Sequence, residues 1–156
     1  MGPLSHRYRL TRGTPGATAV TWIMLNPSVA DEVRSDPTIR RVEGFSGRWG
    51  FERLVVVNLW SARATKPADL RKRARPGGDA RNDDAISAAV AEADKVIAAW
   101  GVHGAWRGRD QEVLALLEGT EVFCLGLTKG GHPRHPLFVP GRQPLLPLPR
   151  QEMLRS

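Results

Sequence analysis

The chain has 156 residues, 41% of them apolar, so we expect one domain over residues 1–156, and its net charge of +7 favours a polyanionic partner such as nucleic acid. Its apolar runs are far shorter than the roughly 20 residues of a membrane span, and its start lacks the apolar core of a signal peptide, so we expect a cytoplasmic protein without a membrane partner. The single cysteine, Cys124, excludes a disulfide framework and a cluster held by four cysteines of this chain.

The first half of the chain alternates strand and helix patterns. His6–Arg12 is typical of a short edge strand, and a turn joins it to a buried strand over Ala17–Leu25, which favours an antiparallel hairpin. Asp36 followed by proline predicts a capped helix over Pro37–Trp49. The apolar run LVVVNLW predicts a second buried strand over Leu54–Trp60.

The second half continues this alternation after a long basic loop at residues 61–81. Its predicted elements are a helix capped by Asn82-Asp83-Asp84, a strand over Lys95–Trp100, a helix over Arg109–Glu118 and a strand over Glu121–Leu127. From Thr128 the chain predicts loop, with a short strand near Leu145–Leu148 and a proline-rich tail over residues 139–156.

This order of elements predicts an α/β fold. Three right-handed crossovers would give a three-layer sandwich whose four-stranded parallel sheet has the order 2-1-3-4, counted from Ala17–Leu25, with an N-terminal edge strand beside it. In such a sheet, ligands bind where the strand order reverses, at the carboxyl ends of the strands. We therefore expect Asn26, Asn58–Ser61, Trp100–His103 and Thr128–Lys129 to converge on one cleft.

Two asparagines at strand ends are candidates for chemistry. Asn26 precedes Pro27 and Ser28, and its amide can orient a water or a ligand, although it cannot take up a proton at neutral pH. A simple turn after the strand is the alternative. Asn58 is polar within a buried strand, where its amide must be satisfied and can read the edge of a nucleobase. An internal bond to a loop backbone is the alternative.

The loop KGGHPRHPLF, Lys129–Phe138, contains two histidines, an arginine and a lysine, which can hold a phosphate or stabilise a developing anion. A surface loop whose prolines fix its path is the alternative. The spacing of His132 and His135 is not a metal signature, because no helix supports it and no third ligand is evident. We expect no metal and no cofactor.

The motifs NPSVADE, DPTIRR, VVNLW, AWG, CLGLTK and HPLF, read in order, resemble a bacterial and phage family, domain-of-unknown-function family sixteen forty-three. WIMLNPSVA, VVVNLW, VIAAWG and the His-Pro loop are also distantly similar to the mismatch-specific branch of the uracil-DNA glycosylases. That resemblance implies the same sandwich, with Asn26 positioning water, Asn58 reading a flipped base, His132 or His135 as the catalytic histidine, and Leu137 opening the strand.

We therefore expect a monomeric DNA glycosylase-like enzyme that hydrolyses the N-glycosidic bond of a damaged, deaminated or modified base flipped from double-stranded DNA. Trp60 or Phe45 would stack on the base, beside Pro27 and Ser28. The phosphates would be held by Arg63, Lys66, Arg71, Lys72, Arg73, Arg75, Lys129 and Arg134. An enzyme acting on free nucleotides or nucleosides is one alternative, and a non-catalytic nucleic-acid binder is another. A solvated basic loop without a partner is the alternative for residues 63–81.

Overall fold

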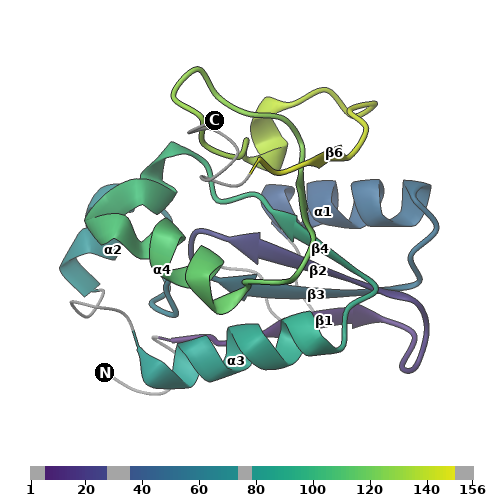
Figure 1. Cartoon of the computed structure of the whole chain (residues 1–156), viewed down its shortest axis with the longest axis horizontal. Coiled ribbons are helices and arrows are strands. Elements are labelled where there is room, and N and C mark those ends of the chain that lie inside the picture. The colour runs from purple at the N-terminus through teal and green to yellow at the C-terminus, as the bar shows by residue number, and fades with distance from the viewer. Residues whose placement is uncertain (1–5, 28–35, 74–78, 150–156) are drawn as a thin grey trace.

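The computed structural model describes residues 6–27, 36–73 and 79–149, which contain a six-stranded sheet in the order β1-β3-β2-β4-β5-β6 (Figure 1). Four of these strands, β3, β2, β4 and β5, run parallel in the relative order expected from the sequence. The protein is therefore α/β, as predicted. The strand bounds are β1 (Leu10–Gly13), β2 (Ala19–Met24), β3 (Arg53–Asn58), β4 (Lys95–Ala98), β5 (Val122–Cys124) and β6 (Leu146–Pro147).

The sheet is mixed, which corrects the expectation of a four-stranded, purely parallel sheet. Each edge carries an antiparallel strand, since β1 pairs with β3 and β6 pairs with β5. The expected hairpin between the N-terminal strand and β2 is wrong, because β2 has parallel neighbours on both sides. The N-terminal edge strand itself does form, and β6 lies where a short strand was expected near Leu145–Leu148.

Helix α1 (Pro37–Arg48) begins as the sequence predicts. Asp36 is its N-cap, and the Asp36 side chain accepts a hydrogen bond of 2.8 Å from the Ile39 N–H. The side chains of Ile39, Val42 and Phe45 are buried against the sheet, as their helical spacing indicates. Because the carboxyl ends of the parallel strands lie near Asp36, this cap places the first turn of α1 beside the expected cleft.

The region before α3 (Ala80–Ala91) differs from the prediction in two ways. A short helix, α2 (Pro67–Arg73), lies within the stretch expected to be loop, with Leu70 buried beneath it. The N-cap of α3 is Asp79, whose carboxylate accepts from the Arg81 N–H, so the predicted cap at Asn82–Asp84 is wrong. Asn82 instead lies buried in the first turns of the helix, where its amide donates a hydrogen bond to the Asn58 carbonyl at the end of β3.

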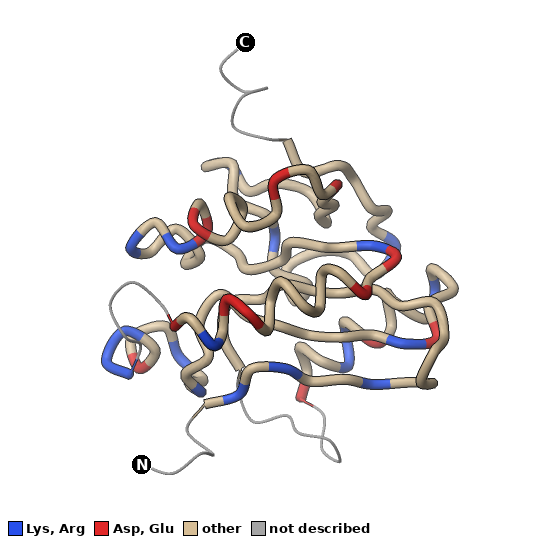
Figure 2. Tube along the Cα trace, turned by 60° about the horizontal axis from the view of Figure 1, so that its bottom comes forward, with Lys and Arg blue, Asp and Glu red and all other residues tan. Residues whose placement is uncertain are grey.

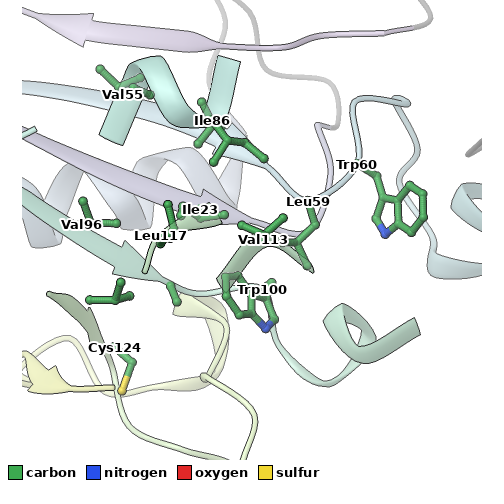
Figure 3. Packing of buried hydrophobic residues seen from close by; sticks show 14 of the residues in the cluster. Ile23, Val55, Leu59, Trp60, Ile86, Val96, Trp100, Val113, Leu117 and Cys124 are labelled. Atoms are coloured by element: carbon green, nitrogen blue, oxygen red, sulfur yellow. The ribbon is translucent and has the colours of Figure 1, made fainter. Parts of the chain in front are cut away.

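Helices cover both faces of the sheet and enclose two core clusters, because successive residues of a strand point to opposite faces. On the α1 face, Trp22 stacks on Trp49, with ring centroids 5.9 Å apart, and packs against Phe45. On the other face, strand residues such as Ile23 and Val96 pack with α3 and α4 (Arg109–Leu116), as Figure 3 shows. None of the helices that the structure describes is long and apolar enough to cross a membrane.

The free thiol of Cys124 lies in the second of these clusters, as Figure 3 shows. Burial raises the pKa of this thiol, and a hydrogen bond from the Gly126 backbone opposes the rise. Cys124 is therefore a buried core residue, as the apolar run around it predicted.

Candidate active site

A cavity of about 750 Å³ opens at the carboxyl ends of the parallel strands, where the strand order reverses. Its volume lies in the range of small-molecule sites. The wall is built by the ends of β2, β3 and β4, the first turn of α1, the segment before α2, and the loop around η3 (Pro136–Phe138). Its polar and charged members among the described residues are Arg7, Asn26, Asp36, Thr38, Asn58, Thr65, His103, Thr128, Arg134 and His135.

Asn26 lies on this wall with its amide held in one orientation. Its Nδ2 donates to the carbonyl oxygens of Ala64 at 2.7 Å and Pro27 at 3.0 Å, and more weakly to that of Ala62 at 3.4 Å. In return, the Ala64 N–H donates to the Pro27 carbonyl. Because the donors of the amide face the backbone, the side-chain oxygen is the atom left to accept from a ligand or a water.

These contacts also explain why an amide occupies position 26. A carboxylate there would be a stronger base, but it has no hydrogen to donate, so the Ala62 and Ala64 carbonyls would face a negative oxygen. Asparagine is the residue that both ties the two loops together and offers an acceptor.

Asn58 ends β3 and lies on the same wall, with only 2% of its surface exposed. Its Nδ2 is buried and makes no hydrogen bond to any described residue. An unpaired buried amide donor costs about 1–3 kcal/mol, and buried polar groups in folded proteins are nearly always paired. Asn58 therefore carries a donor whose partner, on the cavity side, is absent from the described chain.

A buried polar network holds the backbone of Asn58 from the opposite face of the sheet. The Asn82 amide donates to the carbonyl oxygens of Asn58 at 2.8 Å and Leu59 at 3.1 Å. Arg109, which is 1% exposed, donates its Nε to the same Leu59 carbonyl at 2.7 Å and pairs with Asp83. The end of β3 is thus fixed by side chains from α3 and α4, and the orientation of Asn58 toward the cavity follows from it.

The loop after β5 separates the two candidate histidines. The Thr128 N–H donates to the His132 carbonyl and the His132 N–H to the Thr128 hydroxyl, which closes a tight turn with Lys129 at its exposed tip. His132 is not among the described residues of the cavity wall, whereas His135 is. Of the two alignments that the sequence leaves open, the geometry favours His135.

The surroundings of His135 set its charge and its tautomer. Its Nδ1 accepts a hydrogen bond of 3.2 Å from the Leu137 N–H, so in the neutral ring the proton lies on Nε2, which becomes a donor. Burial lowers the pKa of His135, and the negative charge of Asp36 partly opposes this change. His135 is therefore a neutral hydrogen-bond donor at pH 7.

We expect an NMR titration to give His135 a pKa below its ordinary value of about 6.5, and Asp36→Asn to lower it further. Asparagine caps α1 as well as aspartate does but removes the opposing charge. Because the unfolded state binds the proton more readily, the stability that His135 contributes is complete above about pH 6.5 and is lost as the pH falls through the lower, folded pKa. An unchanged His135 pKa in Asp36→Asn would show that the two groups do not interact.

Arg41 of α1 fixes the loop that carries His135. Its Nε donates to the Pro136 carbonyl at 3.2 Å, and its Nη2 donates to the Val139 carbonyl. The loop is thereby tied to the helix whose first turn forms another part of the wall. The η3 turn exposes Phe138 and Leu137 at the mouth of the cavity, with Phe138 76% exposed beside the His135 ring.

The two aromatic residues expected to stack on a ligand, Phe45 and Trp60, are not among the described residues of the wall. Phe45 is buried between Trp22 and Trp49, in the core under α1. Trp60 packs against Trp106 on the opposite face of the sheet, where Figure 3 places its ring beyond Leu59. Both side chains belong to the core, so the structure corrects the expectation that either of them meets a ligand in this cavity.

The basic residues expected to hold phosphates lie in several places, and Figure 2 shows Lys and Arg positions spread along the trace with acidic positions among them. On α2, Arg71, Lys72 and Arg73 are exposed, and the helix begins at Pro67 on the cavity wall. The Arg73 guanidinium donates to the Arg63 carbonyl. Lys66 is exposed just before the helix, and Arg134 lies on the wall itself.

Some predicted residues fall outside the described part of the chain, and several wall residues, among them Arg7, Thr38 and Thr65, were not predicted. Pro27 is buried beside Asn26, whereas Ser28 and Arg75 lie outside the described residues. Arg7 reaches the wall from the segment before β1, which sequence reasoning treated as an edge strand only. No group of three or more His, Cys, Asp or Glu side chains suited to a metal ion occurs within residues 6–27, 36–73 and 79–149.

Comparison with known proteins gives a family but no activity. No curated protein and no solved structure matches the chain. One family model does, described as "Protein of unknown function (DUF1643)", and it matches residues 7–137. This range includes every described polar residue of the cavity wall, from Arg7 to His135. The chain therefore belongs to the DUF1643 family.

Proposed function

We propose that the protein is a DNA glycosylase-like enzyme that hydrolyses the N-glycosidic bond of a base extruded from DNA into this cavity. The observation that carries the proposal is the Asn58 amide, whose buried Nδ2 has no described partner and lies on the cavity wall. A nucleobase edge presents acceptors and donors that such an amide can pair with. A buried unpaired donor also discriminates strongly, because ligands that leave it unpaired are rejected.

Two further groups on the cavity wall, the Asn26 side-chain oxygen and the His135 Nε2–H, suit hydrolysis of the N-glycosidic bond. The side-chain oxygen of Asn26 accepts a hydrogen bond from the attacking water and orients it, and the backbone contacts of its Nδ2 hold that oxygen in place. The Nε2–H of neutral His135 donates to the departing base as the electron pair of the glycosidic bond moves onto it. The water oxygen then bonds to the sugar carbon and loses its proton to solvent.

The neutral amide at position 26 limits the mechanism. Asn26 cannot remove a proton from water, so the glycosidic bond must be largely broken before the water adds, through an oxocarbenium-like transition state. Stabilisation of the departing anion by His135 then matters more than activation of the water. The supporting features are the donor of His135 and the parallel strand order that brings His135 and Asn26 to the wall of one cavity.

The test is an assay on DNA duplexes that each carry one uracil, hypoxanthine or modified base, with abasic sites revealed by alkaline cleavage. We expect at least one of these bases to be released by the full chain. Asn26→Ala should lower that rate about 10–100-fold, since water positioning without proton transfer contributes less than general base catalysis does. If no duplex in the panel acquires an abasic site, the proposal fails.

A further inference from the structure

Two arginines lie on the cavity wall at opposite sides of the row of parallel strands, both beyond carboxyl ends. Arg7 stands beyond the carboxyl end of β3, and Arg134 stands beside the carboxyl end of β5. In the sheet, β2 and β4 lie between these strands. Three strand spacings of about 4.8 Å therefore separate the two ends, or roughly 15 Å in all.

The backbone around Arg7 is held in place by pairing with the segment after β3. Because β1 is antiparallel to β3, the residues before β1 extend past the carboxyl end of β3. The Arg7 N–H donates to the Ser61 carbonyl at 2.9 Å, and His6 forms a bridge with Ala62. The backbone of Arg7 is thus held at this side of the cavity by pairing with the segment after β3.

Arg134 is held by the segment that follows β5. Its N–H donates to the Gly126 carbonyl at 2.9 Å, and its Nε donates to the Leu127 carbonyl at 3.1 Å. A Cβ at Gly126 would come within 3.7 Å of the Arg134 Cδ, so the arginine stem lies over this glycine. The terminal nitrogens extend from an exposed side chain, in a geometry suited to bidentate contact with a phosphate.

The charge of the wall favours an anion at both ends. Among its described residues, Asp36 is the one carboxylate, and it is engaged in capping α1. The mouth of the cavity also carries exposed apolar side chains, Val102, Leu137 and Phe138. Cations at two sides of the wall together with exposed apolar side chains match a nucleic-acid strand, whose phosphates are charged and whose bases offer apolar faces.

We propose that a polynucleotide strand crosses the mouth of the cavity, with one phosphate at Arg7, another at Arg134, and the nucleotide whose base enters the cavity between them. This inference deepens the proposed function and rests on it for the entry of the base. A free nucleoside monophosphate carries a single phosphate group and can meet only one of the two arginines. The site is therefore built for a base within a strand.

The experiment measures binding of a fluorescein-labelled single strand by anisotropy, with the full chain, between about 50 and 200 mM salt. Arg7→Gln and Arg134→Gln should each reduce the slope of log K against log salt by about 0.7, and the double variant by about twice that. Arg48→Gln is the matched control. It removes the same charge at the far end of α1, about 14 Å along the helix from Ile39 on the cavity wall, and should leave the slope unchanged.

Three outcomes overturn the inference: both single variants keep the wild-type slope, Arg48→Gln changes it as much as they do, or a nucleoside monophosphate competes as well as a strand with the same base. Arg134 is exposed, so its variant carries the test even if Arg7→Gln folds poorly. The readout needs no base excision. Reduced slopes without abasic sites would support the strand path and refute the glycosylase proposal, and abasic sites with unchanged slopes would do the reverse.

Discussion

Asn58→Leu should stabilise the protein and at the same time remove the proposed base-release activity. Leucine has a similar size and carries no donor, so the cost of the buried, unpaired Nδ2 disappears and the free energy of unfolding should rise by about 1–3 kcal/mol. A chain of this length gains about 2–4 °C in Tm for each kcal/mol. Base release should fall about 100- to 1000-fold, the range seen when one preorganised donor is removed from an active site.

The matched control is Asn82→Leu. Asn82 is equally buried, but its Nδ2 donates to the Asn58 and Leu59 carbonyls while its Oδ1 has no described partner. This variant removes one unpaired acceptor but leaves two buried carbonyls without that donor, so it should be less stable than Asn58→Leu. Thermal melts of both variants, with base release measured at the same temperature, distinguish the two roles. If Asn58→Leu proves less stable than the wild type, the amide is satisfied within the protein, and the proposal loses the observation that carries it.

The sequence predicted the elements whose signals are local and strong. Continuous apolar runs predicted the parallel strands, because strands of a parallel sheet are buried on both faces. The Asp36-Pro37 start predicted α1. The sequence did not predict strand pairing correctly where several strands compete for the same neighbour. A turn between the N-terminal strand and β2 favours a hairpin, but both edges of β2 are occupied by parallel partners, so the strand pairs with β3 instead.

Two further errors have physical causes in short segments. Helix α2 is brief and buries a single apolar side chain, Leu70, so it leaves no periodic pattern in the sequence. The polar triplet Asn82–Asp84 is typical of a helix N-cap, yet the helix begins earlier, at Ala80. Asp79 is therefore its N-cap. Asn82 then lies within the helix and faces the buried end of β3.

The sequence predicted where the cavity lies in the fold, but only some of the residues that line it. Asn26, Asn58 and His135 meet at one cavity because each follows a parallel strand or its loop, as the topology requires. Trp60 was misplaced because alternation along β3 stops at Asn58, after which side-chain direction no longer follows strand parity. Nothing in the local sequence predicted that Arg7 lies on the cavity wall, since its position depends on the long-range pairing of β1 with β3.

Replacing Arg109 should produce the largest loss of stability among the changes considered. Its guanidinium is 1% exposed, donates to the Leu59 carbonyl, pairs with Asp83, and lies 3.6 Å from Glu112. Arg109→Ala leaves these groups without their partner and empties a buried space. Removing one partner of a buried pair costs about 3–5 kcal/mol. For Arg109→Ala we expect the free energy of unfolding to fall by about 3 kcal/mol, the lower end of this range, because 34% of the Asp83 side chain is exposed to water.

Urea denaturation measures this loss as a lower midpoint at an unchanged slope. Arg109→Met should cost less than Arg109→Ala, because the methionine side chain still fills most of the buried space and the Leu59 carbonyl keeps its bond from Asn82. Glu112→Gln is the control: its pair with Arg109 is half exposed, so its loss should stay below about 0.5 kcal/mol. Since Arg109 fixes the backbone next to Asn58, Arg109→Met should also lower base release while the fold persists. An Arg109→Met protein with full activity would mean that Asn82 alone suffices to position the end of β3.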